Sequence, residues 1–310
     1  MRSAAADKQP ALRTALLPLL LLVVAMCSIQ LGSALAKTLF PIIGARGMSV
    51  LRLGFAALIL CAVFRVWRLS MSPGSWLQVA RYGAALGLMN LFFYLALQRL
   101  PLGIVVALEF TGPLTVALWH SRRAVDFFWA GVAIIGLALL VPWQHALSLA
   151  RIDLVGIGCA LGAGFFWALY IVWGRKAGLA AGPSSVAVGM AVGAFIVLPV
   201  GALQALPALS APALLGTAVA VALLSGVLPY TLEMLALTRL PARVFGVSMS
   251  MEPAIAALSG WLVLGEKLSA LQYLAIAAVM AASGGAAWSD RFPRDAAAGP
   301  ATHRAAGRHP

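Results

Sequence analysis

The 310 residues of this chain carry too few charges for a soluble protein. Hydrophobic residues make up 62% of the sequence and charged residues only 10%, whereas about a quarter of residues are charged in a typical soluble domain. The formal net charge of +13 does not indicate nucleic-acid binding, because the basic residues sort by membrane side rather than onto one surface. The composition excludes a soluble domain and predicts an integral membrane protein.

Ten apolar segments follow one another along the chain, and about 20 apolar residues are enough to cross a bilayer. Their connections are mostly short, so no segment between them can bury a core of its own. We therefore predict an all-α integral membrane fold with ten transmembrane helices. The segments are residues 16–36, 48–67, 76–97, 102–119, 127–143, 154–173, 186–203, 213–234, 242–264 and 268–288.

The first segment also has features of a secretory signal peptide. Lys8 and Arg13 precede its apolar run, and Ala34-Leu35-Ala36 offers an A-x-A cleavage pattern. We expect the segment to be retained, because the run is long for a signal peptide and its removal would leave an odd number of spans.

An internal repeat organises the spans. The hexapeptide at 96–101 (ALQRLP) returns at 236–241 (ALTRLP), and in this register Pro113 aligns with Pro253. Each copy then contains five spans, and an odd number of spans inserts the second copy upside down relative to the first, as in many secondary transporters. The sequence therefore predicts two inverted five-helix repeats.

These repeats divide the chain into four parts. We predict a cytoplasmic N-terminal segment at 1–14, a first repeat at 15–147, a second repeat at 148–288 and a disordered, basic cytoplasmic tail at 289–310. With the N-terminus inside, sixteen of the 22 Lys and Arg residues fall on inner segments, five fall on outer loops, and Arg52 lies within a span. The positive-inside rule then predicts that both termini are cytoplasmic.

Four charged residues stand out within the predicted spans: Arg52, Glu109, Glu233 and Glu252. A charge near the bilayer centre costs at least about 2.5–3.5 kcal/mol on insertion scales, so each needs a partner or a function. None of the three carboxylates is duplicated between the repeats. We interpret them as substrate- and proton-coupling residues, with Arg52 within reach of Glu109.

Simpler interpretations remain open for these charges. Arg52 can extend outward to lipid headgroups, and Glu233 lies close enough to an inner boundary to be a solvated end charge. Glu109 and Glu252 are farther from either interface. A purely structural role would leave them without an obvious partner.

Polar or amphipathic side chains inside apolar runs are the candidates for lining a pocket near these charges. They are Gln30, Asn90, Tyr94, Thr111, Trp167, Tyr170, Tyr230 and Ser250. Pro113 and Pro253 are expected to bend their helices, since a proline frees the carbonyl group four residues before it. We expect these kinks to face a polar cavity, the alternative being that they only shape packing.

Three G-x-x-x-G pairs predict close helix packing: Gly83 with Gly87, Gly158 with Gly162, and Gly189 with Gly193. We interpret them as contacts within the chain rather than as a dimer face. The three cysteines lie in predicted spans without ligand-like spacing, so no metal or cofactor is predicted. The sequence also lacks the common hydrolase and nucleotide-binding motifs, and we expect no enzyme.

Several stretches carry a family resemblance: 108–113 (LEFTGP), 228–234 (LPYTLEM), 250–253 (SMEP), 264–266 (LGE) and 35–37 (LAK). With them the chain resembles the drug/metabolite transporter superfamily, EamA type, and within it the bacterial threonine and homoserine exporters. The resemblance implies a ten-helix inverted-repeat carrier in the bacterial cytoplasmic (inner) membrane. It also implies export of small neutral amino acids, in exchange for protons.

The buried charges suit such a substrate. A zwitterionic amino acid needs an acceptor for its ammonium group, for which Glu109 or Glu252 is suitable, and donors for its carboxylate, for which Arg52 or freed backbone N–H groups are suitable. Desolvation favours the protonated form of a buried carboxyl group, so protonation would compete with substrate binding. The expected partners are amino acids, protons and membrane lipids. A broader metabolite or drug exporter of the same fold is the alternative, and an intramembrane enzyme or a passive scaffold is a more distant one.

Overall fold

The computed structural model describes residues 9–119, 124–140, 153–237 and 248–289, and these ranges are almost entirely helical. The predicted N-terminal segment up to residue 8, the junction between the repeats and the tail from 290 onward lie outside the described residues, as does most of the second copy of the repeated hexapeptide. The elements are α1 (Gln9–Thr38), α2 (Phe40–Phe64), the short 3-10 helix η1 (Val66–Arg68), α3 (Pro73–Leu97), α4 (Leu102–Glu109), α5 (Thr111–Trp119), α6 (Ala124–Leu140), α7 (Leu154–Ala181), α8 (Ser184–Leu209), α9 (Pro212–Ala222), the π-helical turn η4 (Leu223–Val227), α10 (Leu228–Leu237), α12 (Glu252–Leu264) and α13 (Ala270–Ser289).

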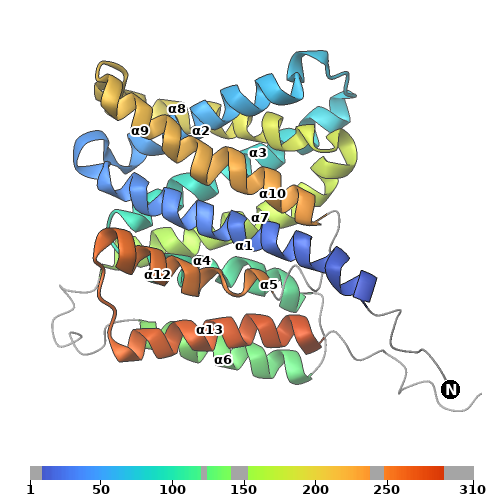
Figure 1. Ribbon diagram of the computed structural model, residues 1–310, viewed down its shortest axis with the longest axis vertical. Coiled ribbons are helices and arrows are strands. Elements are labelled where there is room, and N and C mark those ends of the chain that lie inside the picture. The colour runs from blue at the N-terminus through green and yellow to red at the C-terminus, as the bar shows by residue number, and fades with distance from the viewer. Residues whose placement is uncertain (1–8, 120–123, 141–152, 238–247, 290–310) are drawn as a thin grey trace, which may run out of the picture.

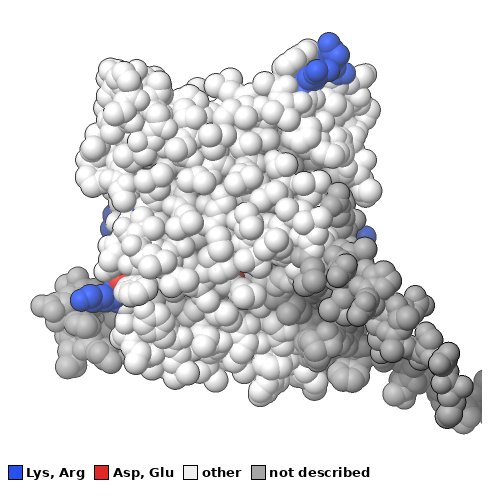
Figure 2. All heavy atoms as spheres, viewed as in Figure 1, with Lys and Arg blue, Asp and Glu red and all other residues white. Residues whose placement is uncertain are grey.

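The prediction of an all-helical membrane protein is confirmed for this part of the chain. Six apolar stretches are long enough to cross a membrane: Leu17–Thr38, Phe40–Phe64, Pro73–Leu97, Leu154–Ala181, Ser184–Leu209 and Pro212–Glu233. Shorter apolar helices occupy Leu102–Val116, Phe127–Leu139, Glu252–Leu264 and Ala270–Ala282. The helices run side by side across the view of Figure 1, and Lys and Arg side chains gather near the edges of the face shown in Figure 2.

Three of the predicted spans are not continuous α-helices, and the segment at 242–264 is one of them, because a turn at 250–251 precedes α12. The segment at 102–119 is interrupted at Phe110, between α4 and α5, because Pro113 has no N–H to donate to the carbonyl of Glu109. The segment at 213–234 contains the π turn η4. There Ser28 Oγ donates to the carbonyl of Leu224 at 2.6 Å, and Arg52 donates to the carbonyl of Ser225. Side chains that take carbonyl groups out of the helical ladder commonly produce such turns.

Glycines determine how closely α3 and α8 approach. A Cβ atom on Gly87 would lie 2.6 Å from the Cα atom of Gly193, and one on Gly83 would lie 2.7 Å from the carbonyl oxygen of Gly189. The prediction of packing within the chain is confirmed for these two motifs. In the third motif only Gly162 makes such a contact: a Cβ there would lie 3.0 Å from Cδ1 of Phe92 on α3, whereas one on Gly158 would meet no described atom within 4 Å.

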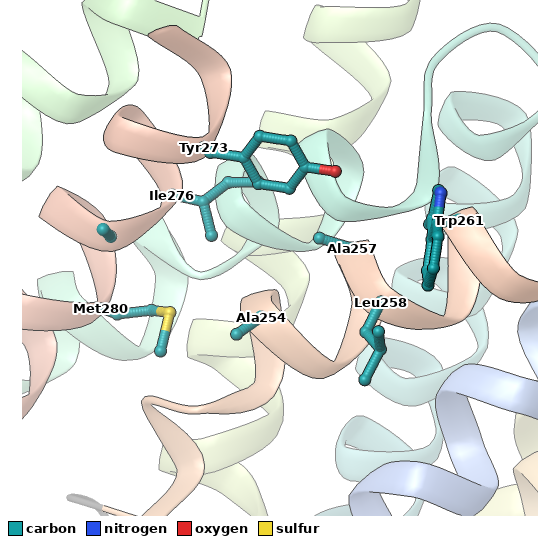
Figure 3. A pocket seen from close by; sticks show the side chains of 8 residues that line it. Ala254, Ala257, Leu258, Trp261, Tyr273, Ile276 and Met280 are labelled. Carbon is teal, nitrogen blue, oxygen red and sulfur yellow. The ribbon is translucent and has the colours of Figure 1, made fainter. Parts of the chain in front are cut away.

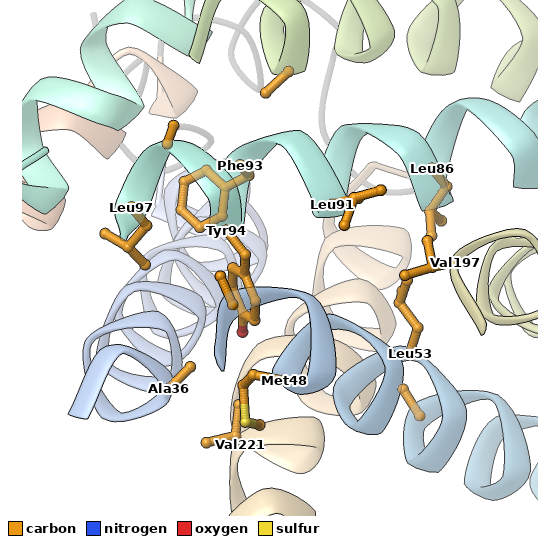
Figure 4. Packing of buried hydrophobic residues seen from close by; sticks show 14 of the residues in the cluster. Ala36, Met48, Leu53, Leu86, Leu91, Phe93, Tyr94, Leu97, Val197 and Val221 are labelled. Carbon is orange, nitrogen blue, oxygen red and sulfur yellow. The ribbon is translucent and has the colours of Figure 1, made fainter. Parts of the chain in front are cut away.

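The packing of the helices places the polar residues between them. α2 packs on α3 and α8, α3 packs on α7, and α1 lies against α10, η4 and α12. α6 and α13 form a pair along the lower edge in Figure 1. Apolar side chains fill the interior: in Figure 4, Tyr94 reaches from α3 toward Met48 of α2 and Val221 of α9. A polar side chain that points into this interior is therefore withdrawn from both lipid and water.

Candidate functional site

Arg52 is the centre of a buried polar cluster. Only 2% of this residue of α2 is exposed. Nη1 donates to Oδ1 of Asn90 on α3, Nη2 donates to the carbonyl oxygen of Ser225 in η4 at 2.5 Å, and the guanidinium lies 5.3 Å from the centre of the Tyr94 ring. Asn90 Nδ2 donates in turn to the carbonyl of Leu86 at 2.8 Å, which orients the amide.

These contacts correct two of the expectations for Arg52. Its side chain does not extend to lipid headgroups, and within the described residues it forms no ion pair with Glu109. The physical reason is that the side-chain oxygen of Asn90 and the free carbonyl of η4 already satisfy the two ends of the guanidinium fork.

A second buried pair joins α1 to α12. Gln30 Nε2 donates to Oε1 of Glu252 at 3.0 Å, and the two residues are 2% and 6% exposed. Glu252 is the first residue of α12, where the helix N-terminus stabilises a negative charge. The carboxylate therefore faces protein rather than lipid.

Five buried polar atoms around these two groups have no hydrogen-bond partner in the described part of the chain. Two can act as donors, Arg52 Nε and the hydroxyl of Tyr94, and three can act as acceptors, Gln30 Oε1, Glu252 Oε2 and Ser33 Oγ. Unsatisfied buried polar groups are costly, so a set of them marks a place where another molecule, or water, completes the hydrogen bonding. The donors belong to the Arg52 cluster and two of the acceptors to the Gln30–Glu252 pair.

Glu109 lies close to both groups but bonds to neither. It is the last residue of α4 and is 7% exposed. It interacts electrostatically with Glu252 and with Arg52, yet no hydrogen bond to its carboxyl group is formed among the residues that the structure describes. Glu109 and Glu252 therefore lie in the same charged region, but of the two only Glu252 accepts a hydrogen bond from a described side chain.

Glu109 and Glu252 each lie beside a break in a helix, and each break precedes a proline. Glu109 ends α4 and Pro113 lies in the first turn of α5, whereas Glu252 and Pro253 begin α12 after a turn at 250–251. The prolines thus lie in the first turn of a helix rather than in the middle of one. In a first turn the N–H group has no partner within the helix, so its absence at a proline costs no hydrogen bond.

The other predicted pocket residues divide into two sets. Tyr230 interacts with Asn90 and Arg52, and its ring lies 6.5 Å from that of Tyr170, which stacks in turn on Tyr82. Glu233 is half-buried near these tyrosines and interacts electrostatically with Glu252. This set extends the charged region along α7 and α10.

Thr111 and Trp167 make local contacts around the break between α4 and α5. Thr111 Oγ1 donates to the carbonyl of Leu108 at 2.7 Å, and Trp167 packs edge-on against Phe110 at 5.4 Å. Ser250 is buried beside Gly284 of α13.

Two apolar pockets lie elsewhere in the described structure. One, of about 300 Å³, is lined by residues of α12 and α13, among them Trp261 and Tyr273 (Figure 3). The other, of about 420 Å³, lies between α2 and the η4–α10 segment. None of the predicted site residues lines either pocket.

The sequence analysis missed two features of this region. The carbonyl oxygen of Ser225 accepts a hydrogen bond from Arg52, and it is free to do so because it lies in the π turn. Lys37 and Glu266 form an ion pair of 2.6 Å. Their stretches, LAK and LGE, were visible in the sequence, but charges at span ends are ordinarily taken as solvated.

Comparisons with known proteins agree with this architecture. The sequence profile of the EamA-like transporter family matches residues 154–286. The chain is 53% identical over 269 residues to the threonine/homoserine exporter RhtA of Escherichia coli (strain K12) and to that of Salmonella typhimurium (strain LT2), covering 87% of this chain and 90% of each relative. A protein of known crystal structure, whose description names no activity, superposes with a TM-score of 0.55 at 17% identity, covering 88% of this chain and 99% of its own. That likeness concerns the fold alone. The extended identity to curated exporters shows that this chain belongs to the EamA-like transporter family.

Proposed function

We propose that this chain exports threonine, homoserine or closely similar small neutral amino acids across the bacterial cytoplasmic membrane in exchange for protons. The 53% identity to threonine/homoserine exporters over most of the chain supports the substrate class. The observation that carries the mechanism is the pair of buried polar groups with unsatisfied donors at one and unsatisfied acceptors at the other.

The proposed architecture is that of an inverted repeat. Residues 15–147 and 148–288 form two five-helix units of opposite orientation, which together give ten transmembrane helices with both termini in the cytoplasm. The two helix interruptions support this arrangement, because they occur at corresponding places before Pro113 and Pro253. The substrate then lies where the two units meet, as in other inverted-repeat carriers.

The polar groups match the two ends of an amino acid. Arg52 Nε and the Tyr94 hydroxyl supply donors for the substrate carboxylate, while Glu252 Oε2 and Gln30 Oε1 supply acceptors for its ammonium group. Gln30 also holds the carboxylate of Glu252 through its amide. Each end of the zwitterion thereby replaces hydrogen bonds that it loses on leaving water.

Glu109 is the proposed proton carrier. Its carboxyl group receives no hydrogen bond among the described residues and lies near the negative charge of Glu252. A substrate ammonium group that binds Glu252 compensates that negative charge and so favours release of the proton, while protonation favours release of the substrate. Glu233 and the tyrosines beside it supply polar groups along the route toward the cytoplasm.

Counterflow in proteoliposomes tests the proposal. Labelled threonine and homoserine should exchange across the membrane, and an imposed pH gradient should drive net flux. Glu109→Gln should keep the exchange but lose its dependence on the gradient, whereas Glu252→Gln should lose both. Asp153→Asn, at a half-exposed carboxylate, is the matched control.

The contrary results are equally clear. Undiminished gradient-driven flux in both glutamine variants would contradict the mechanism. Transport of an apolar cation in competition with threonine would indicate a broader drug or metabolite exporter.

A further inference from the structure

Lys37 and Glu266 tie three segments together at one end of the bundle. Lys37 Nζ donates to Glu266 Oε1 at 2.6 Å and to the carbonyl oxygen of Leu100 at 2.8 Å, while the N–H of Leu102 donates to Glu266 Oε2 at 2.8 Å. The end of α1, the turn before α4 and the end of α12 thus meet in one set of contacts. We call it the Lys37–Glu266 clasp.

The clasp differs from an ordinary surface ion pair. Its side chains are only 21% and 14% exposed, whereas those of the neighbouring pair Arg99–Asp153, 3.1 Å apart, are 46% and 32% exposed. A Cβ atom on Gly260 would collide with the carboxylate of Glu266, and the Glu266 N–H donates to the carbonyl of Gly260. The end of α12 is therefore shaped to receive this carboxylate.

The clasp closes one end of a polar seam between α1 and α12. Gln30, Ser33 and Lys37 have the i, i+3, i+7 spacing that places them on one face of α1. Gln30 bonds to the first residue of α12, and Lys37 bonds to Glu266 just beyond the end of that helix. Ser33 lies between them, 1% exposed and without a hydrogen-bond partner among the described residues. Such a seam can separate and hydrate more readily than an apolar one.

Burial around the site is uneven along the bundle. Gln30, Arg52, Asn90 and Tyr94 are at most 3% exposed. Tyr170 and Glu233 are half-buried. Gln30 and Ser33, which share a face of α1 with Lys37, are therefore closed off in the described conformation.

We propose that the Lys37–Glu266 clasp is a gate, and that its opening separates α1 from α12 and connects the amino-acid site with that side of the membrane. Under the proposed orientation this is the outer side, so the gate controls release of the exported amino acid. The inference goes beyond the proposed function, because it concerns access to the site and holds for any solute carried there.

Thiol labelling from each side of the membrane tests the gate. In a variant whose native cysteines, Cys27, Cys61 and Cys159, are replaced by serine, one cysteine at Ser33 reports on the seam and another, in a separate variant, at Tyr170 reports on the opposite side. Vesicles of each orientation are treated with the impermeant reagent MTSET. Asp153→Asn serves as the matched control, because it neutralises an ion pair beside the same turn.

Glu266→Gln keeps an acceptor for the Leu102 N–H but removes the charge that attracts Lys37. It should raise labelling at position 33 from the clasp side by about threefold or more, and it should lower labelling at position 170 from the other side. A general loosening of the fold would raise both rates. That result, or equal labelling of the Glu266→Gln and Asp153→Asn variants, would overturn the proposal.

Cross-linking gives a second, independent test. The double variant Lys37→Cys with Glu266→Cys, joined by a short bis-methanethiosulfonate, should lose at least about nine-tenths of its threonine counterflow and recover it on reduction. Flux that continues through the linked protein would contradict a gate at this place. The labelling result stands even if threonine proves not to be the solute, so a failure of the gate and a failure of the proposed function are distinguishable.

Discussion

Alanine at Gly87 would disturb the closest contact between α3 and α8. Its Cβ atom would lie 2.6 Å from the Cα atom of Gly193 and 2.8 Å from that residue's carbonyl oxygen. Carbon atoms pack at roughly 3.5–4.0 Å, so the two helices must separate by about 1 Å. The opposing atoms belong to the backbone, and a change of rotamer cannot relieve the overlap.

The expected cost follows from this geometry. Overpacking of a close contact destabilises a protein by about 1–3 kcal/mol, and 1 kcal/mol lowers Tm by roughly 2–4 °C for a chain of about this size. Gly87→Ala should therefore lower Tm by roughly 2–12 °C. Asn90 lies one turn farther along α3 and bonds to Arg52, so the same displacement should also reduce threonine counterflow.

Thermal unfolding in detergent, followed by fluorescence-detected size exclusion, measures the effect. Gly158→Ala is the control, because a Cβ there meets no described atom within 4 Å. Alanine is also the better helix former by about 1 kcal/mol, so the control should keep or raise its Tm. The packing argument is refuted if the two variants have the same Tm.

Three further changes test the site and one exposed cap. Gln30→Leu removes the N–H donated to Glu252; since a hydrogen bond to a charged group contributes about 1.5–3 kcal/mol, KM for threonine counterflow should rise at least about tenfold, and an unchanged KM would argue against this role. Arg52→Lys keeps the charge but loses the planar fork, so exchange should fall below a tenth of wild type at equal expression, and near-normal exchange would contradict the assignment. Asp153 accepts the Gly156 N–H at 2.7 Å and lies beside Arg99, which together hold its pKa below the ordinary value of 3.8. Because that pKa is lowered on folding, the stabilisation of about 1 kcal/mol expected of such a cap is present above pH 4 and is lost as the pH falls below it. The Tm difference between wild type and Asp153→Ala should shrink as the pH falls from 4 toward this lowered pKa, and a difference that is undiminished at pH 3 would exclude this cause.

Local sequence determined most of the secondary structure. Each predicted apolar segment overlaps a helix of the structure, because twenty apolar residues in lipid have few alternatives to a helix that satisfies its own backbone. The interruption at Phe110 could also be anticipated, since it follows from the missing N–H of Pro113. The π turn at 223–227 could not, because side chains from α1 and α2 hold its carbonyl groups.

The site shows the same division. Composition alone identified Arg52, Glu109 and Glu252 as charges that enter the membrane, because their cost in hydrocarbon depends only on the apolar residues around them. Their partners were a matter of tertiary structure. Asn90 and Ser225 lie 38 and 173 residues from Arg52, and Gln30 lies 222 residues from Glu252. Whether such a hydrogen bond forms depends on the distance between two helices to within a few tenths of an ångström. The sequence pattern of any one helix does not contain that information.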